Sequence, residues 1–268
     1  MARAGVLGWP VSHSRSPAMH EAAYRHLGLS EWSYQRLPVP PSLFTETVRA
    51  LPGSRFVGVN VTIPHKEAAL AIADSATPAA LAIGAANSLA FASDGSIQAD
   101  NTDAPGLIAA LPRSPKGQTA LILGAGGSAR AVLWALLGAG AAQVHVWNRT
   151  PTRALEICDA IGGGEPTSAT HRADLLINCT AAGLSDQAST FDELPIGPSD
   201  LGDYGCVVDL MYRDGSGRTA LLSAADAAGT KTVDGIEILV QQGAISLSAW
   251  TGLAAPIGVM LSAAREPT

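Results

Sequence analysis

A run of small residues near the middle of the chain has the composition of a nucleotide-binding turn. Gly124-Ala125-Gly126-Gly127-Ser128-Ala129 follows the apolar stretch ALIL and precedes a second apolar segment. Glycine lets a backbone turn tightly and approach a pyrophosphate, and the following helix would offer free N–H groups at the positive end of its dipole. A G-x-G-x-x-A pattern between a strand and a helix predicts a dinucleotide site, although a tight turn without a ligand is the simpler alternative.

The residues after the next apolar stretch, QVHVW, indicate which nicotinamide cofactor fits. An acidic residue at this place would accept hydrogen bonds from a ribose 2′-hydroxyl and repel a 2′-phosphate. The sequence has Asn148-Arg149-Thr150 instead, with Arg153 one helical turn further on. Two guanidinium groups and two neutral side chains suit a phosphate, so we predict NADP rather than NAD. The alternative is that Arg149 and Arg153 only coat an exposed helix start.

Three polar segments outside this region could supply a second set of functional groups. They are residues 12–17, 60–66 and 100–103, and each follows or closes a predicted strand. Because ligands of open α/β sheets collect at the carboxyl ends of the strands, we expect these segments to line one cleft. Their hydroxyls, amides, one ammonium and one carboxylate suit a small polyhydroxy acid, whose groups need directional donors and acceptors.

Alternating strands and helices must position these residues. Hydrophobic periodicity in the first half predicts strands over residues 4–7, 32–37, 56–61 and 85–91, and helices over 16–27, 42–50 and 66–73. The second half predicts strands over residues 120–123, 143–147, 175–178 and 206–209, and helices over 128–137, 221–228 and 236–250. This alternation predicts an α/β fold.

We expect two domains. The first, residues 1–103, is an N-terminal α/β substrate domain, and the second, residues 104–234, is a Rossmann-type domain with a doubly wound parallel sheet for NADP. The C-terminal helices, residues 235–268, are expected to return to the first domain and pack on it. Hinges near Asp103 and Asp234 would then permit the cleft to open and close.

Composition narrows the classes of function. The chain has 268 residues, 47% of them hydrophobic, and a formal net charge of −6, which disfavours nucleic acid as a partner. Cys158, Cys179 and Cys206 are too far apart for a C-x-x-C pair, so neither a disulfide framework nor a structural metal is predicted. No export signal or membrane span is evident, and we expect a cytoplasmic monomer or homodimer that acts on a small molecule.

Eight short stretches carry a family resemblance. They are SHSRSP (12–17), GVNVTIPHK (58–66), GAANS (84–88), DNTD (100–103), GAGGSARA (124–131), NRTPTRA (148–154), DGIEILVQQGA (234–244) and WTG (250–252). With these stretches in this order, the sequence resembles the shikimate dehydrogenase family over nearly its whole length. The resemblance implies an NADP-linked oxidoreductase that interconverts 3-dehydroshikimate and shikimate, in the chorismate pathway to aromatic amino acids.

The resemblance also implies roles for individual residues. Lys66 and Asp103 would be the catalytic pair. The substrate carboxylate and ring hydroxyls would be bound by Ser14, Ser16, Asn60, Thr62, Asn87, Tyr212 and Gln242. The cofactor would be bound by the glycine turn, by the four polar residues after QVHVW, by Thr180, and by the backbone at Gly235, which would meet the nicotinamide ring.

The chemistry of such a reaction explains why a lysine and a carboxylate would be needed. Oxidising a secondary alcohol removes a hydride from carbon and a proton from oxygen, so a positioned base must accompany the nicotinamide. Burial of Lys66 would favour its neutral amine, whereas a neighbouring Asp103 would favour the ammonium, and the sequence leaves both states open. In either state Asp103 can align Lys66 with the reacting hydroxyl.

Plainer roles remain open for several of these residues. Lys66 could be a surface lysine that opens a helix, and Ser14 and Ser16 could be helix caps. His13, His20 and His65 invite a metal hypothesis, but no carboxylate or cysteine stands beside them at a ligand spacing. Leu247 and Trp250 are expected in the core rather than the site.

Four departures from the family pattern limit the transfer. Ser88 stands where threonine is usual, Ala99 where glycine is usual, and Ala181 and Leu184 replace serine and methionine. Tyr212 is followed by Arg213-Asp214-Gly215 rather than Asn-Pro. Two alternatives also stay open: a quinate or shikimate dehydrogenase of broader specificity, and a non-catalytic relative that senses NADP or a cyclic acid.

Overall fold

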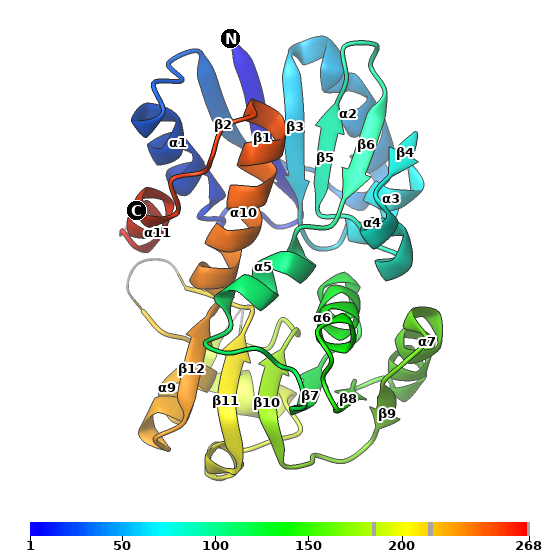
Figure 1. Ribbon diagram of the computed structural model, residues 1–268, viewed down its shortest axis with the longest axis vertical. Coiled ribbons are helices and arrows are strands. Elements are labelled where there is room, and N and C mark those ends of the chain that lie inside the picture. Colours follow the sequence, from blue (N-terminus) through cyan, green and yellow to red (C-terminus); the bar gives the residue numbers. More distant parts are fainter. Residues whose placement is uncertain (184–185, 214–216, 267–268) are drawn as a thin grey trace. The chain divides into compact units, whose positions relative to one another are not determined.

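The computed structural model describes residues 1–183, 186–213 and 217–266, and its chain divides into two compact units (Figure 1). Unit 1 consists of Met1–Gly106 and Leu239–Thr268, and unit 2 consists of Leu107–Ile238. Each unit contains one six-stranded sheet. Leu184, Asp214 and Gly215, which are among the residues that depart from the family pattern, lie outside the described residues.

The sheet of unit 1 is mixed. Its strands are β1 (Ala2–Gly8), β2 (Trp32–Pro38), β3 (Phe56–Val61), β4 (Ser75–Ala76), β5 (Ser88–Phe91) and β6 (Ile97–Asp100). They are ordered β2-β1-β3-β5-β6-β4, as Figure 1 shows. The three strands β2, β1 and β3 are parallel, while β5 is antiparallel to both β3 and β6. The carboxyl ends of β1 and β3 therefore lie at the same edge, which is where two of the polar segments begin.

The helices of unit 1 cover this sheet. They are α1 (Ser16–His26), α2 (Phe44–Ala50), α3 (Lys66–Ala71), α4 (Pro78–Ile83), α5 (Asp103–Ala110), which runs on into unit 2, the C-terminal part of α10 (Gly235–Thr251), and α11 (Ile257–Arg265). Buried apolar residues of β3, β5 and β6 pack with α2 and α3 in one core cluster that includes Phe44, Val59 and Leu89. On the other flank, α11 packs against α1.

A buried arginine joins α11 to the start of α1. Arg15 is 1% exposed, and its Nε donates to the carbonyl oxygen of Ala264 at 3.1 Å. Its Nη2 donates to the carbonyl oxygens of Ala263 and Glu266. These carbonyls lie at the C-terminal end of α11, where the helix leaves acceptors without partners and a cation is favoured. Residues 249 positions apart in the chain are therefore bonded directly.

A close approach explains one glycine of unit 1. A Cβ added to Gly58, in β3, would lie 2.2 Å from Nε1 of Trp250 and 2.6 Å from the carbonyl oxygen of Leu89. Any side chain here would collide with the indole that α10 lays across the sheet. Leu247 on the same helix is fully buried, and Trp250 is half-buried, as expected for residues that pack the core.

The sheet of unit 2 has the order and direction of a Rossmann fold. Its strands are β7 (Thr119–Leu123), β8 (Gln143–Trp147), β9 (Glu165–Thr167), β10 (Ala173–Asn178), β11 (Tyr204–Asp209) and β12 (Lys231–Asp234). All neighbouring pairs are parallel, in the order β12-β11-β10-β7-β8-β9 (Figure 1). Counted from β7, this is the 3-2-1-4-5-6 arrangement of dinucleotide-binding folds. The predicted fold class is confirmed.

The helices of unit 2 connect these parallel strands. They are α6 (Gly127–Gly138), α7 (Pro151–Ile161), the short α8 (Thr190–Glu193), α9 (Ala220–Ala227) and the first turn of α10. Strands buried on both faces read as continuous apolar runs, and the residues of β7 from Ala120 to Leu123 are all fully buried. Strand β7 lies between β8 and β10, so the topological switch point, at which Rossmann folds bind dinucleotides, is at the carboxyl end of β7.

One predicted strand is wrong in its extent. Residues 85–91 were expected to form one strand, but β5 begins only at Ser88. The preceding backbone is engaged by loops: the N–H of Ala86 donates to the carbonyl oxygen of Lys66, and the carbonyl oxygen of Ala85 accepts from the Asn101 side chain. Gly84, with φ of 73°, ends α4 just before this point. Within the described ranges, no helix has the length and apolar character needed to span a bilayer.

Candidate active site

Lys66 and Asp103 form an ion pair in unit 1. Lys66 is the first residue of α3, shortly after β3, and Asp103 is the first residue of α5, shortly after β6. The Lys66 Nζ lies 2.6 Å from Oδ2 of Asp103, and the two side chains are 11% and 16% exposed. This pairing is inconsistent with a solvated surface lysine. A partly buried pair of opposite charges with limited access to solvent is the arrangement expected of an acid–base group.

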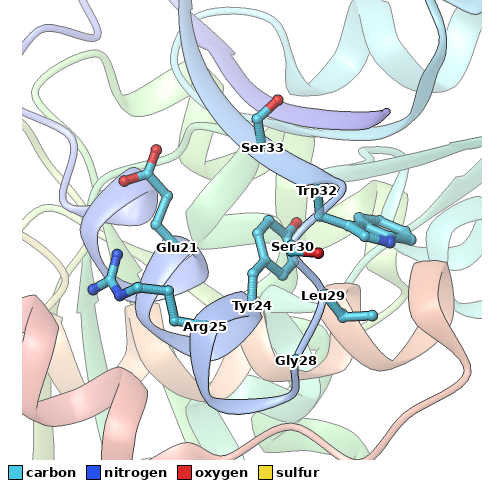
Figure 2. A pocket seen from close by; sticks show the side chains of 8 residues that line it. All are labelled: Glu21, Tyr24, Arg25, Gly28, Leu29, Ser30, Trp32 and Ser33. Carbon is cyan, nitrogen blue, oxygen red and sulfur yellow. The ribbon is translucent and has the colours of Figure 1, made fainter.

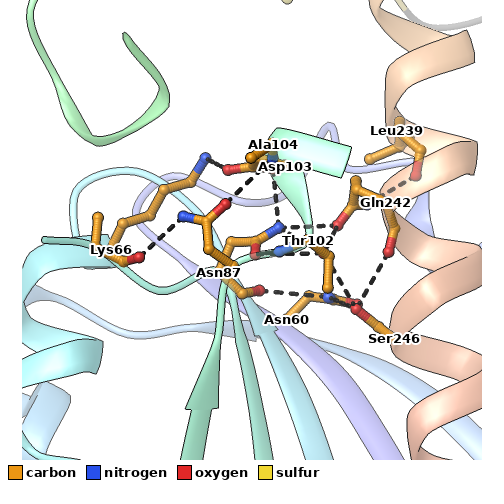
Figure 3. A network of polar contacts seen from close by, with 11 residues as sticks. Asn60, Lys66, Asn87, Thr102, Asp103, Ala104, Leu239, Gln242 and Ser246 are labelled. Carbon is orange, nitrogen blue, oxygen red and sulfur yellow. Dashed lines mark hydrogen bonds and ion pairs between the residues drawn. The ribbon is translucent and has the colours of Figure 1, made fainter. Parts of the chain in front are cut away.

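Asn87 fixes the other oxygen of this carboxylate (Figure 3). The Asn87 Nδ2 donates to Oδ1 of Asp103 at 2.8 Å and to Oγ1 of Thr102 at 3.0 Å. Its Oδ1 accepts the backbone N–H of Thr102 at 2.6 Å, which settles the orientation of the amide. Both oxygens of Asp103 therefore have a partner, and the carboxylate cannot rotate without losing one of them.

Helix α10 contributes to the same network. Oε1 of Gln242 accepts from Asn87 Nδ2 at 3.1 Å and from Thr102 Oγ1 at 3.3 Å. One helical turn further on, Ser246 Oγ accepts from Asn60 Nδ2 at 2.8 Å, and Asn60 Oδ1 accepts from the Tyr34 hydroxyl at 2.8 Å. Figure 3 shows the side chains of Asn60, Asn87, Thr102, Gln242 and Ser246 meeting between the ends of the strands and α10. Predicted residues from four separate segments are thus brought together.

Three members of this network, Tyr34, Thr102 and Ser246, were not predicted as site residues. Thr102 lies inside the DNTD segment, and its hydroxyl and backbone both bond to Asn87. Ser246 follows Gln242 by four residues, so it lies on the same face of a helix. The sequence contains this signal, because a residue four positions after Gln242 in a predicted helix lies on the same helix face, and that residue is Ser246.

The SHSRSP segment is ordered by its own contacts. Oγ of Ser14 lies 3.2 Å from Oγ of Ser16 and accepts the Ser16 N–H at 3.3 Å. Arg36 donates twice to the Ser14 carbonyl oxygen, at 3.1 Å from Nε and 2.7 Å from Nη2. The N-cap of α1 is Arg15, and no side chain caps the helix, so neither serine is its N-cap. Thr62 lies half-buried in the turn between β3 and α3.

Two of the histidines considered as metal ligands are buried beside aromatic rings. His65 bonds through Nε2 to the carbonyl oxygen of Val39 at 2.8 Å and stacks on Phe44, and burial lowers its pKa. His20 is fully buried and stacks on Tyr34 with ring centroids 4.2 Å apart, and burial lowers its pKa to about 3. Among the described residues, no group of three or more His, Cys, Asp or Glu side chains is placed to hold a metal ion.

A separate pocket of unit 1 does not involve the site residues. It has a volume of about 370 Å³ and lies where the end of α1 meets the start of β2, with Tyr24 and Trp32 among its lining residues (Figure 2). Glu21 and Arg25 lie at its other side. None of the eight lining side chains was predicted to bind substrate or cofactor.

The glycine turn of unit 2 has the geometry that a dinucleotide requires. Gly124 has φ of 109°, a conformation that other residues rarely adopt, and its added Cβ would lie 3.1 Å from the backbone of Cys179. Gly126 is the N-cap of α6, a twelve-residue helix, and the space beside its Cα is open. A pyrophosphate can therefore approach this backbone and the helix N-terminus, so the turn fits the predicted cofactor.

The residues after β8 fit a 2′-phosphate. Arg149, Thr150 and Arg153 are exposed, and Asn148 Nδ2 donates to the Thr150 carbonyl oxygen at 2.9 Å. Thr150 is the N-cap of α7, whose first turn carries no acidic residue. Two cations and a free helix start without a nearby carboxylate in the first turn are suited to an added phosphate group.

The remaining predicted residues of unit 2 lie at the ends of β10, β11 and β12. Thr180 follows β10, Tyr212 follows β11, and Gly235 follows β12. A Cβ at Gly235 would lie 2.7 Å from the carbonyl oxygens of Leu210 and Met211, so glycine is required there. These positions share the carboxyl edge of the sheet with the glycine turn.

The fold and the two sets of residues define a class of protein: a nucleotide-binding α/β oxidoreductase with a Rossmann-type unit and a second unit carrying a Lys–Asp pair. Three family models match the chain. They are the shikimate dehydrogenase substrate binding domain (residues 6–89), shikimate / quinate 5-dehydrogenase (109–185) and the shikimate 5′-dehydrogenase C-terminal domain (235–265). The chain belongs to the shikimate dehydrogenase family.

Individual relatives agree with this assignment. A curated shikimate dehydrogenase (NADP(+)) from Methylobacterium radiotolerans is 43% identical over 264 residues, which cover 93% of this chain and 91% of that protein. The crystal structure of shikimate 5-dehydrogenase from Thermus thermophilus, in complex with NADP(H) and shikimate, is 40% identical, with a TM-score of 0.87 and 99% of each chain covered. A 5-ketofructose reductase from Gluconobacter is 32% identical, with a TM-score of 0.81 and 98% and 97% covered.

Proposed function

We propose that this protein catalyses the reversible, NADP-dependent reduction of 3-dehydroshikimate to shikimate, a step of chorismate and aromatic amino acid biosynthesis. The observation that carries the proposal is the 2.6 Å pair of Lys66 and Asp103, held by an amide and hydroxyl network, in a chain of this family. The protein would work in the cytoplasm as a monomer or homodimer. Residues 1–103 and 235–268 would form the substrate domain, and residues 104–234 the NADP domain.

In this proposal, Lys66 and Asp103 manage the proton. During reduction the Lys66 ammonium donates a proton to the carbonyl oxygen of the substrate, and during oxidation the neutral amine accepts it back from the hydroxyl. Asp103 stabilises the ammonium and accepts a hydrogen bond from the substrate hydroxyl on a remaining lone pair. NADPH, when bound, supplies the hydride. Asn87 keeps Asp103 oriented throughout, because it donates to Oδ1 while Lys66 Nζ lies 2.6 Å from Oδ2.

The substrate would be held by neutral polar groups. Ser14 and Ser16 would present adjacent hydroxyls to the substrate carboxylate. Arg36, in β2, holds this segment in place by donating to the Ser14 carbonyl oxygen. The other contacts would come from Asn60, Thr62, Asn87, Tyr212 and Gln242. A site built to hydrogen-bond substrate hydroxyls rejects analogues that lack them, because its buried polar groups would then lose their partners.

The cofactor would be held by unit 2. Its pyrophosphate would lie on the backbone of Gly124, Ala125, Gly126, Gly127, Ser128 and Ala129, and its 2′-phosphate beside Asn148, Arg149, Thr150 and Arg153. Thr180 and Gly235 would approach the nicotinamide half, because the second mononucleotide of a Rossmann fold lies over the strands on the far side of the switch point.

A substrate and cofactor assay tests the proposal. Purified protein given shikimate and NADP⁺ should produce reduced nicotinamide, seen as an absorbance increase, and should do so far more slowly with NAD⁺. Binding of both ligands without turnover would favour the alternative of a non-catalytic sensor. Turnover with NAD⁺ at the same efficiency would contradict the assignment of the phosphate pocket.

A broader substrate range is the second candidate. The Gluconobacter relative is named for reduction of a ketosugar, and one of the matching family models includes quinate. One additional ring hydroxyl on the substrate demands only a small change of the pocket. Comparing kcat/KM for shikimate, quinate and 5-ketofructose distinguishes a specific biosynthetic enzyme from a broader dehydrogenase.

A further inference from the structure

Asp209 is a buried carboxylate that the proposed chemistry does not use. It ends β11, is 1% exposed, and lies in register with Asp234 of the neighbouring strand β12. A buried charge is costly unless its hydrogen-bonding capacity is filled. Burial, with a smaller effect from the charge of Asp234, raises the pKa of Asp209 to about 6, so the structure tolerates an unfavourable ionised group here.

Three neutral donors of unit 2 bond to the Asp209 carboxylate. Its Oδ1 accepts from Asn178 Nδ2 at 2.9 Å and from the Met211 N–H at 3.1 Å. Its Oδ2 accepts from the Thr219 hydroxyl at 2.6 Å, and Thr219 in turn caps α9 through Leu222. One carboxylate thus connects the end of β10, the loop after β11 and the start of α9.

The contact with Asn178 determines the conformation of the next loop. Since Oδ1 of Asp209 accepts, Asn178 must present its amide nitrogen to it and its oxygen to the other side. That oxygen accepts from Thr180 twice, from the backbone N–H at 3.0 Å and from Oγ1 at 2.7 Å. Oγ1 of Thr180 then accepts the N–H of Ala182 at 3.1 Å. The relay runs from Asp209 through Asn178 to Thr180.

The relay ends against the glycine turn. The Cγ2 of Thr180 lies 3.2 Å from the position of a Cβ on Gly124, so this loop packs directly on the turn. On the other side of Asp209, the backbone of residues 209–211 packs on Gly235. A Cβ added to Gly235 would lie 2.9 Å from the Asp209 carbonyl oxygen. Asp209 therefore lies beneath the two places, at Thr180 and Gly235, that would meet the nicotinamide half of the cofactor.

We propose that Asp209 is a positioning residue for the nicotinamide half of NADP, which acts through Asn178 on the loop at Thr180 and through Met211 on the loop beneath Gly235. The inference rests on the proposed use of NADP. It does not involve the 2′-phosphate pocket after β8, so binding of the adenosine half should be independent of Asp209.

The shape of the hydrogen bonds, rather than the charge, is what matters in this arrangement. An asparagine at this position can keep all three contacts: its oxygen accepts from Asn178 and Met211, and its nitrogen donates to the Thr219 hydroxyl oxygen. An alanine keeps none and leaves the Asn178 amide free to rotate away from Thr180. The two variants therefore separate geometry from charge.

The experiment compares two ligands by calorimetric titration of the full chain: NADP⁺ and adenosine 2′,5′-bisphosphate, which contains only the adenosine half. Asp209→Ala should weaken NADP⁺ binding about tenfold and change the bisphosphate affinity less than about twofold, since only the nicotinamide side loses its support. Asp209→Asn should bind both ligands within about threefold of the unmodified protein.

Asp174→Ala is the matched control. Asp174 also accepts from a backbone N–H and a hydroxyl, both of Thr119, at 2.8 and 3.0 Å, but at the amino ends of β7 and β10, the edge of the sheet opposite to Asp209. The Asp174→Ala variant should bind NADP⁺ and the bisphosphate with unchanged affinity. If Asp209→Ala does not fold, Asn178→Ser breaks the same relay with a smaller change in buried charge, and retained bisphosphate binding shows that the variant is folded.

Three results would overturn the inference: NADP⁺ binding unchanged in a folded Asp209→Ala or Asn178→Ser protein, equal weakening of both ligands, or an Asp209→Asn protein as weak as Asp209→Ala. Failure of the proposed function is a different result. It would appear in the unmodified protein, as a lack of NADP⁺ binding or of shikimate turnover.

Discussion

A carboxylate near the carboxyl end of a strand in unit 1, Asp103, differs from one in unit 2, Asp209, in its exposure and in the charge of its partners. In unit 1, Asp103 is 16% exposed and pairs with the opposite charge of Lys66. In unit 2, Asp209 is 1% exposed and its hydrogen bonds come from neutral groups. The group proposed to reach a substrate is accessible and charge-paired, whereas the group proposed only to shape loops is sealed from solvent. The raised pKa of Asp209 is the consequence of that sealing.

The buried His20 of unit 1 and the buried Asp209 of unit 2 carry charges of opposite sign when ionised. In unit 1, His20 lies among the rings of Tyr24, Tyr34 and Trp250, and its ring nitrogens have no hydrogen-bond partner in the part of the chain that the structure describes. Burial disfavours the charged form of each group, so His20 resists gaining a proton and Asp209 resists losing one. Through these two groups alone, acidification should weaken unit 1 and strengthen unit 2.

Replacing Lys66 of unit 1 should have the largest effect, which is on the rate of catalysis. Lys66→Met keeps much of the side-chain volume but can neither donate nor accept the proton, so kcat should fall by about 10² to 10⁴. The affinity for NADP⁺ should stay unchanged, as measured by titration. Lys116→Met, at an exposed position of unit 2, is the control. A rise in KM with no loss of kcat would assign Lys66 to binding rather than to catalysis.

The next effect is the acid sensitivity contributed by His20. Its pKa is about 3 in the folded protein against an ordinary value of 6.5, so the unfolded chain binds the extra proton and stability is lost as the pH falls below 6.5. The free energy of unfolding should decrease by up to about 5 kcal/mol between pH 7 and pH 3 from this group alone. Urea unfolding of His20→Gln across this range should show a flatter profile. His26→Gln, at an exposed position of the same helix, should leave the slope unchanged.

Asp209 should contribute in the opposite direction. Its pKa is about 6 when folded against an ordinary value of 3.8, so the folded protein holds the proton more tightly and stability falls as the pH rises from 4 to 6. The contribution is about 3 kcal/mol and is absent in Asp209→Asn, which should be the more stable protein at pH 7. An Asp209→Asn protein that unfolds at lower urea concentration at pH 7 would show that the ionised carboxylate is favourable.

The exposed cations of unit 2 should give the smallest effect. Arg149→Ala should reduce the preference for NADP over NAD about tenfold, because one charge-assisted contact to the 2′-phosphate is lost in a solvated setting. Arg172→Ala, an exposed arginine of the same unit that pairs with Asp203 at 2.8 Å, is the control. Steady-state kcat/KM values for the two cofactors measure the ratio. If the ratio of kcat/KM values for NADP and NAD is unchanged in Arg149→Ala, Arg149 does not bind the 2′-phosphate.

The sequence was most informative for strands rich in valine and other apolar residues. The bounds of β3 and β8 agree with prediction, because runs such as FVGVNV and QVHVW have no helical spacing. The strands β4 (Ser75–Ala76) and β12 (Lys231–Asp234) gave no signal. A two-residue strand has no periodicity, and β12 lies at an edge, where one polar face is tolerated.

For the site, residue types were predictable but their contacts were not. Lys66 and Asp103 are 37 positions apart, and only the fold brings their side chains to 2.6 Å. Asp209 was not predicted as a functional residue for a different reason. Its segment, CVVD, is a buried strand ending in one acid, and nothing in that pattern tells a solvated acid from one sealed by Asn178 and Thr219.

The bond from Arg15 to the end of α11 has a practical consequence for handling the protein. A truncation that stops before Ala263 would remove the acceptor carbonyls and strand a guanidinium inside the fold, next to the serines of residues 12–17. Affinity tags and fusion partners are therefore better attached at Met1, which is 59% exposed. Loss of shikimate affinity after trimming the last helix would be expected, although that helix carries none of the proposed contact residues.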